Sequence, residues 1–241
     1  MNLKRKFTTV LAIFLFAGGN ILNLYVSSNL LWGEMEARLF TQQASDRQLD
    51  IDCPLMIAAW ETATIRTVVT NDLPEQATKP QVNAFIATES EPRIETQTLE
   101  LGALESQSLQ WTVDNSDIVF DRLILVSILQ RPYRDLESRQ GSCSIYVFSL
   151  LDMNGSDTLA SVITTGVLVS LLGIGALYYS LRPLSEFATK VIQVNGIFLF
   201  LVLAGLFSAL PRMWGLTLIF NAAALLVITV ASVEIFFSRK S

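Results

Sequence analysis

Four apolar stretches interrupt this chain, and they constrain its fold more than any other feature. They cover residues 7–32, 158–181, 191–210 and 213–237. A helix needs about 20 residues to cross a hydrocarbon core of about 30 Å, and each stretch is long enough. A content of 51% hydrophobic and only 16% charged residues fits the same interpretation. We therefore expect an α-helical membrane protein with four transmembrane helices.

The basic residues predict how the chain is oriented. They cluster at residues 4–6, at Arg182 and Lys190 between the second and third stretches, and at residues 239–240. Short loops rich in Lys and Arg remain in the cytoplasm. We expect an integral membrane protein, in the plasma membrane, with both termini cytoplasmic and residues 33–157 extracytoplasmic.

The first apolar stretch could be either a signal peptide or a retained anchor. Its basic leader followed by an apolar run is typical of both. The run continues to Trp32, which is longer than a signal-peptide core, and no small-x-small cleavage site closes it. We predict a retained signal anchor. Cleavage would leave three spans.

The segment between the first two stretches is strongly acidic. Residues 33–157 hold 20 acidic and 9 basic side chains, a net charge of −11. Nucleic acid and anionic lipid surfaces would repel such a domain, so no nucleic-acid partner is expected. A solvated acidic surface that keeps the domain soluble is the simplest interpretation.

Residues 51–153 follow the period-2 alternation of β-strands, with turn residues at short intervals. Seven short strands indicate an all-β sandwich. Trp60 and Trp111 are its largest apolar side chains, and both are expected in the core. The candidate strands are 53–60, 62–70, 81–88, 93–101, 107–113, 118–129 and 143–150.

Two parts of this segment resemble a known kind of domain. Residues 62–71 end in Val69-Thr70-Asn71, and residues 102–113 run from Gly102 through a Glu-Ser turn into an aromatic-bearing strand. This order is similar to that in bacterial immunoglobulin-like (CARDB-like) β-sandwich domains, although Ala103 and Leu104 separate the Gly from the Glu here. The resemblance covers residues 53–150. It implies the sandwich fold and a role in adhesion or subunit contact, and it carries over no functional residues.

The same resemblance implies a disulfide. Cys53 and Cys143 are the only cysteines, and both lie in the compartment where disulfides persist. In immunoglobulin-like sandwiches the first and last strands commonly run parallel and side by side, which would bring the two sulfurs together. We expect a structural Cys53–Cys143 bond.

This pairing has a geometric consequence for residues 33–50. A first strand parallel to the last one must begin at the end of the domain far from the second span. Residues 33–44 contain good helix formers. We therefore predict a helical or extended stalk along the flank of the domain. The expected division is 1–32 leader and anchor, 33–50 stalk, 51–153 sandwich and 154–241 three-helix membrane region.

Small and polar residues mark the faces on which the membrane helices are expected to pack. Gly166, Ser170 and Gly173 share one face of the second span, and Asn20 and Asn23 form a polar stripe on the first. Two interpretations remain open. The faces hold the four helices together, or the asparagine face meets a helix of another protein.

Polar residues within the membrane segments are the usual sign of transport. Glu234 is the one ionisable candidate, and it lies near enough to Arg239 and Lys240 to reach the interface. Asn221 is the polar residue of the fourth span. A transport path would have to use these two residues.

The chain offers little for catalysis. It has no histidine, which removes the commonest general base and metal ligand. The carboxylate pairs Glu89/Glu91 and Asp114/Asp117 lie in turn-like segments, where solvated acids are usual. We expect no catalytic residue, cofactor or metal site.

These observations favour a non-enzymatic, membrane-anchored interaction protein, an accessory or assembly subunit that presents the sandwich outside the cytosol. Its expected partners are other membrane proteins or a second copy, met through the membrane helices, and membrane lipids. The loops 71–80, 89–92 and 131–141 are candidate binding edges. The last is the most contact-like, because it holds Arg131, Tyr133 and Arg134. The alternative is a small transporter or channel component with an acidic extracytoplasmic domain.

Overall fold

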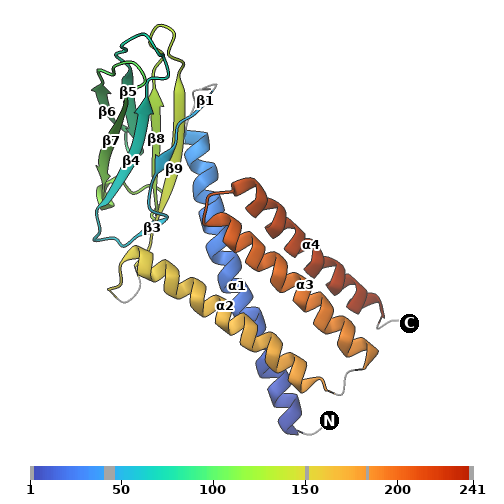
Figure 1. Ribbon diagram of the computed structural model, residues 1–241. Helices are drawn as coiled ribbons and strands as arrows, with labels where there is room; N and C mark the ends of the chain where they lie inside the picture. Colours follow the sequence, from blue (N-terminus) through green and yellow to red (C-terminus); the bar gives the residue numbers. More distant parts are fainter. Residues whose placement is uncertain (1–2, 41–46, 150–151, 183–184, 239–241) are drawn as a thin grey trace. The chain divides into compact units, whose positions relative to one another are not determined.

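The computed structural model describes residues 3–40, 47–149, 152–182 and 185–238. The chain divides into two compact units (Figure 1). The helical unit comprises Met1–Leu31 and Ala160–Ser241, and the β unit comprises Trp32–Leu159.

The described chain contains four long helices. They are α1 (Leu3–Phe40), α2 (Gly155–Ser180), α3 (Glu186–Ala209) and α4 (Trp214–Ser238). All four are long and apolar enough to cross a membrane, as the sequence predicts. α1 is longer than its predicted span, because the helix formers after Trp32 continue it to Phe40.

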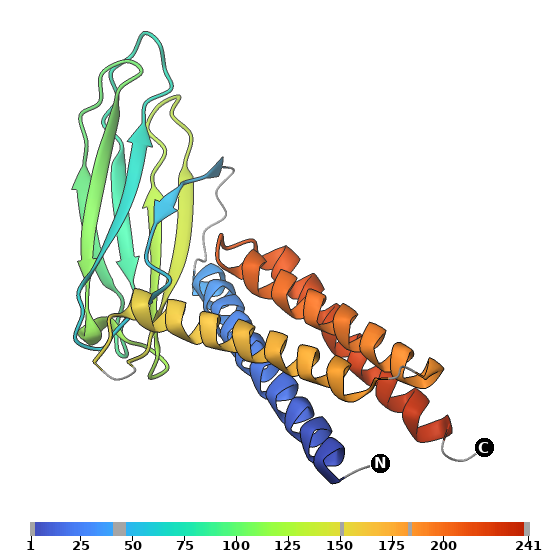
Figure 2. The same ribbon diagram turned by 60° about the horizontal axis from the view of Figure 1, so that its bottom comes forward.

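Within the helical unit, α3 and α4 form an antiparallel hairpin (Figures 1 and 2). Ser185 caps the start of α3, where its hydroxyl accepts a hydrogen bond from the Ala188 amide at 3.2 Å. α1 contributes Phe16, whose ring meets Phe198 of α3 edge to face at 6.3 Å. These rings join Leu199, Val202 and Ala224 in one buried cluster.

The β unit is a sandwich of two sheets. One sheet has the strand order β1-β9-β8-β5-β6, with β3 also paired to β9, and the other has the order β2-β4-β7. The strands are β1 (Arg47–Gln48), β2 (Ile51–Asp52), β3 (Met56–Ile57), β4 (Ala63–Thr70), β5 (Gln81–Ile86), β6 (Arg93–Thr98), β7 (Ser106–Val113), β8 (Leu123–Gln130) and β9 (Arg139–Val147).

The core between the sheets follows the alternation read from the sequence. Burial alternates strictly along β4 and along the second half of β7, and Ile65 lies opposite Trp111 in the ladder that joins them. Trp111 is 2% exposed and packs with the inward residues of β5, β8 and β9. The prediction that Trp111 lies in the core is confirmed.

Residues 47–57 close one side of the sandwich by crossing between the sheets. β1 and β3 pair with β9, both in parallel, and β2 pairs antiparallel with β4. The parallel pairing of first and last strands that the resemblance implies is therefore present. The predicted single strand 53–60 is wrong, because the chain changes sheets there and Pro54 offers no amide to a ladder.

The disulfide implied by the resemblance is present. Cys53 lies between β2 and β3, and Cys143 lies in β9. Their sulfurs are bonded, with the two Cα atoms 6.6 Å apart and 90 residues between them along the chain. The bond joins the crossing segment to the strand it accompanies.

Two other expectations about this domain are wrong. Trp60 is 53% exposed, because it lies in the turn between β3 and β4 and not in a strand. The strand predicted over 118–129 begins only at Leu123. A short 3₁₀ helix, η1 (Asn115–Asp117), and a turn with positive φ at Phe120 and Asp121 occupy the preceding residues.

The two motifs behind the resemblance meet in space. Asn71 is fully buried, and its side chain donates to the carbonyls of Gln76 and Gly102, each at 2.7 Å. Its own amide donates to the carbonyl of Glu105 at 2.9 Å. The motif residues therefore lock two loops together at one end of the sandwich, which is a structural role.

Removing the disulfide should destabilise the sandwich substantially. We expect the Cys53→Ser/Cys143→Ser double variant to lose about 4 kcal/mol of unfolding free energy, because its unfolded chain is no longer closed into a long loop. Urea unfolding in mild detergent measures this change. A reductant should lower the stability of the wild type by a similar amount and leave the double variant unchanged. Equal stability of the two proteins would contradict the expectation.

Candidate interaction surfaces

The small-residue face of α2 packs against α1 within the chain itself. A Cβ atom added at Gly166 would lie 2.3 Å from Asn23 Oδ1, and one added at Gly173 would lie 2.3 Å from the Phe16 amide nitrogen. The Asn23 amide also donates to the Ser170 hydroxyl at 3.4 Å. Gly166, Ser170 and Gly173 are thus brought together with Asn23 as the seam between two helices.

This seam decides between the two interpretations of the asparagine stripe. Asn20 and Asn23 are 2% and 1% exposed, and Asn20 donates back to the Phe16 carbonyl of its own helix at 2.7 Å. Because the chain's own helices bury both side chains, the face is not available to a helix of another protein. The structure supports the first interpretation, in which the stripe holds the chain's own helices together.

The other polar residues of the helices also find partners within the helical unit. Asn221 exchanges hydrogen bonds with Ser27 of α1 at 3.3 and 3.4 Å, and it lies against Gly205 of α3. Ser208 and Thr217 bond across the α3–α4 hairpin at 3.0 Å. Such contacts fasten helices to one another in a membrane. The Glu234 side chain lies outside the described residues.

The loop residues Arg131, Tyr133 and Arg134 lie between β8 and β9. Arg131 and Arg134 are exposed, and the Arg134 guanidinium lies 5.5 Å from the centre of the Tyr133 ring. Loops 71–80 and 131–141 share one end of the sandwich, where Asp72 is ion-paired with Arg139. Loop 89–92 connects β5 to β6 at the opposite end. The three candidate loops therefore do not form one binding edge.

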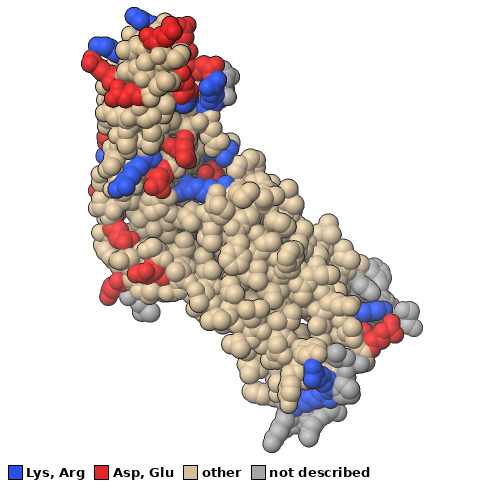
Figure 3. All heavy atoms as spheres, in the orientation of Figure 1, with Lys and Arg blue, Asp and Glu red and all other residues tan. Residues whose placement is uncertain are grey.

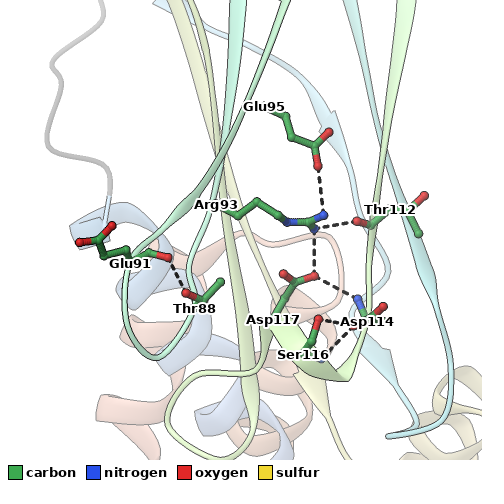
Figure 4. A network of polar contacts seen from close by, with 8 residues as sticks. All are labelled: Thr88, Glu91, Arg93, Glu95, Thr112, Asp114, Ser116 and Asp117. Atoms are coloured by element: carbon green, nitrogen blue, oxygen red, sulfur yellow. Dashed lines mark hydrogen bonds and ion pairs between the residues drawn. The ribbon is translucent and has the colours of Figure 1, made fainter.

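An ion pair between an exposed arginine and a buried carboxylate ties the two sheets together at their other edges (Figure 4). Arg93 of β6 donates to the Thr112 carbonyl of β7 at 2.9 Å and to the Asp117 carboxylate at 3.0 Å. Asp117 Oδ2 also accepts from the Asp114 amide at 3.2 Å, and Asp114 accepts from Ser116. This arrangement spans the side of the sandwich opposite the disulfide.

Sequence reasoning missed this network. It treated Asp114 and Asp117 as solvated acids, which is wrong for Asp117, since that residue is 4% exposed. The signal was present, because an acidic residue three positions after a capping Asp is the spacing of a reciprocal capping box. Nothing in the spacing, however, identifies Arg93 as the ionic partner.

The two carboxyl groups of this network are shifted in opposite directions. Burial raises the pKa of Asp117, while the Asp114 amide and the Arg93 charge act against that shift. Hydrogen bonds from the Ser116 hydroxyl and amide lower the pKa of Asp114. Among the described residues, no group of three His, Cys, Asp or Glu side chains is placed to hold a metal ion.

One sheet of the sandwich is covered on its outer face. β8 is buried along its whole length, including Leu123, Leu125 and Leu129, which point away from the core. Gly33 of α1 lies against Leu123 and Ser144, since a Cβ there would approach their side chains to 3.3 and 2.6 Å. The helical part of the predicted stalk therefore lies on this sheet. Residues 41–46 of the stalk lie outside the described residues.

The other sheet is open. The outward residues of β4 and β7 are exposed and face one another in the ladder as Thr64 with Thr112, Arg66 with Gln110, and Val68 with Ser108. We call these six residues the open face. The open face carries no carboxylate, although Asp52 of β2 lies beside Arg66 at its margin.

The charged side chains are distributed differently over the two units. On the face drawn in Figure 3, Asp, Glu, Lys and Arg gather over the β unit and at the ends of the helices. The middle of the described helices is free of them on that face. This distribution is the one expected of helices whose central turns contact hydrocarbon.

No protein-family model and no curated protein sequence matches the chain. Similar solved structures include the CARDB domain of the PF1109 protein from Pyrococcus furiosus, crystallised with di-metal ions. It is 11% identical, with a TM-score of 0.32 over 45% of this chain and 95% of that one. A red sea bream transglutaminase is 12% identical, with a TM-score of 0.35 over 45% of this chain and 17% of that one.

The first of these structures is a domain of the kind that the sequence resembles. A Bacteroides uniformis beta-glucuronidase also matches, at 21% identity and a TM-score of 0.28, over 41% of this chain and 12% of that one. These TM-scores are too low to carry an argument about function. The assignment of the fold rests on the two sheets and their common core.

The helix seam predicts a clear contrast between two glycines of α2. Gly173→Ala should destabilise the helical unit, because its Cβ would overlap the Phe16 backbone. Gly175→Ala is the matched control, since nothing lies within 4 Å of its Cβ position. Thermal unfolding in detergent micelles compares the two, and equal midpoints would contradict the described seam.

The Arg93–Asp117 ion pair predicts a stability loss and a pH dependence. Arg93→Gln should cost about 1–3 kcal/mol by leaving Asp117 without its charged partner. Arg66→Gln, an exposed arginine of the open face, should cost little. Urea unfolding measures both.

The raised pKa of Asp117 fixes the sign of the pH effect. Asp117 binds a proton more readily in the folded protein than in the unfolded chain. Its contribution to the stability of the fold therefore falls as pH rises through the pKa that it has in the folded protein. The wild type should therefore lose stability relative to Asp117→Asn on going from acid to neutral pH. A constant difference between the two proteins would refute the assignment.

Proposed function

We propose that this protein is a non-enzymatic, membrane-anchored interaction protein, an accessory or assembly subunit of a membrane complex. The four apolar helices cross the bilayer, with α1 as a retained signal anchor. Basic clusters at residues 4–6, at Arg182 and Lys190 and at residues 239–240 support a cytoplasmic position for both termini. The sandwich, with its disulfide, then stands on the extracytoplasmic side.

The open face is the observation that carries this proposal. The outer face of β8 is buried and meets the chain's own α1 at Leu123, whereas the β4–β7 sheet leaves its outward residues exposed. Charged residues are depleted at the centres of protein interfaces. The open face has no carboxylate, although residues 33–157 have a net charge of −11. Its composition is therefore the one expected at the centre of a protein interface.

A rigid support adds to the argument. β4 and β7 pair over eight positions, from Ala63 with Val113 to Thr70 with Ser106. The Cys53–Cys143 bond fastens one side of the sandwich, and the Arg93–Asp117 ion pair fastens the other. A face held in this way loses little conformational entropy when a partner binds.

Crosslinking from the open face tests the proposal. The full-length tagged protein would carry a photo-reactive amino acid in place of Val68, which is 54% exposed, and would be irradiated in its native membrane. Purification in mild detergent and mass spectrometry then identify the products. We expect one membrane protein to be crosslinked at 68 and to co-purify in a fixed ratio. The same probe at Arg131, in the loop between β8 and β9, serves as the control.

The outcomes separate the alternatives. A partner crosslinked at 131 and not at 68 would move the contact to the loops and overturn the role of the open face. A protein that purifies alone, without crosslinks at either position, would overturn the interaction function. Flux assays would then test the transporter alternative, for which the Asn221–Ser27 pair offers only a helix contact.

A further inference from the structure

We propose that one end of the sandwich inserts aromatic side chains into the headgroup region of the outer leaflet, at a zwitterionic lipid surface. The side chains are Trp60, Phe120 and Phe148, and we call them the aromatic end. The inference rests on the membrane crossing proposed above, and it is independent of any protein partner.

The three aromatic residues come from separate connections and lie at the same end of the domain. They are 53%, 63% and 38% exposed. The Phe148 amide donates to the Ile57 carbonyl at 3.0 Å, just before the turn that holds Trp60. The Val147 amide donates to the Arg122 carbonyl at 2.8 Å, at the close of the turn that holds Phe120. Backbone hydrogen bonds thus join all three connections.

Phe120 lies in a tight hairpin turn, across which Val119 and Leu123 exchange backbone hydrogen bonds at 2.7 and 3.0 Å. Phe120 and Asp121 have φ angles of 53° and 59°, the left-handed conformation that glycine and asparagine adopt readily and phenylalanine does not. Arg122 donates back to the Val119 carbonyl and closes the turn. This turn holds the Phe120 ring outward, and the described part of the β unit leaves the side chain 63% exposed.

A lipid interface would meet this end of the domain in a chain that crosses the membrane as proposed, because both connections to the apolar helices leave the β unit here. The Glu61 carboxylate accepts from the Gly155 amide at 2.8 Å and from the Ala58 amide at 2.6 Å. Gly155 is the first residue of α2, so the second span starts beside the turn of Trp60. Gly33 of α1 lies against Leu123, the first residue of β8, near the turn of Phe120.

The side-chain chemistry matches a particular surface. Tryptophan and other amphipathic aromatic rings collect at the headgroup level of bilayers. Glu61, Asp121 and Asp152 outnumber Arg122 at this end, and the net negative charge would be repelled by anionic headgroups. The aromatic end therefore suits zwitterionic phosphatidylcholine or phosphatidylethanolamine lipids, with insertion that depends little on salt.

Spin labelling tests this inference on the full-length protein in phosphatidylcholine liposomes. Trp60→Cys, Phe120→Cys and Phe148→Cys each add one thiol for a nitroxide, since both native cysteines are disulfide-bonded. Collision with oxygen reports lipid, and collision with a nickel chelate reports water. We expect the oxygen-to-nickel ratio at the aromatic end to exceed that of Leu104→Cys several-fold.

Leu104 is a close match for Phe120. It is 65% exposed with φ 56°, and it lies in the β6–β7 connection at the opposite end of the sandwich. Leu168→Cys, on an exposed position of α2, marks a label in hydrocarbon. The labels at 60, 120 and 148 could give the same oxygen-to-nickel ratio as the label at 104 while the label at 168 still reports lipid. That result would overturn the insertion and leave the proposed function standing. A water-exposed label at 168 would overturn both.

A second variant pair separates insertion from folding. Phe120→Asn and Leu104→Asn each replace a strained apolar residue by one that tolerates the left-handed conformation, so both should keep or raise the unfolding midpoint. Only Phe120→Asn should lower the oxygen-to-nickel ratio of a label at 148. An unchanged ratio would overturn the inference.

Discussion

The parallel pairing of residues 47–57 with β9 is the constraint on which the rest of the β unit depends. Two parallel neighbours run in the same direction, so a chain that leaves β9 for α2 at one end must enter β1 at the other. That requirement explains why α1 continues to Phe40 beyond its apolar stretch. It also supplies a helix to cover β8, a strand that is apolar on both faces.

Features that depend on local pattern could be predicted from the sequence. The alternation in β4 and β7 placed Ile65 and Trp111 in the core, and runs of about 20 apolar residues gave the four helices. The disulfide came from a resemblance and could not be derived from spacing. Trp60 was misplaced, because a strand pattern does not show where a chain changes sheets. Arg93 and Asp117 meet across 24 residues, a distance over which sequence pattern carries no signal.

The candidate interaction residues of the helices show a different limit. Gly166, Ser170 and Gly173 were recognised as a packing face because small side chains at helical spacing allow close approach. Their partner could not be deduced, since the same pattern serves contacts within a chain and between chains. The structure assigns them to α1, and it gives Asn221 to Ser27 in the same way. These polar residues fasten the described helices to one another.

The position of the disulfide determines how the protein transmits mechanical load. Tension between α1 and α2 enters the β unit near β1 and leaves it after β9, and the Cys53–Cys143 bond joins these two paths covalently. The 90-residue loop that it closes contains β4 and β7, so force bypasses them. A pull on the two connections is therefore carried by the crossing segment and β9, while the open face keeps its shape.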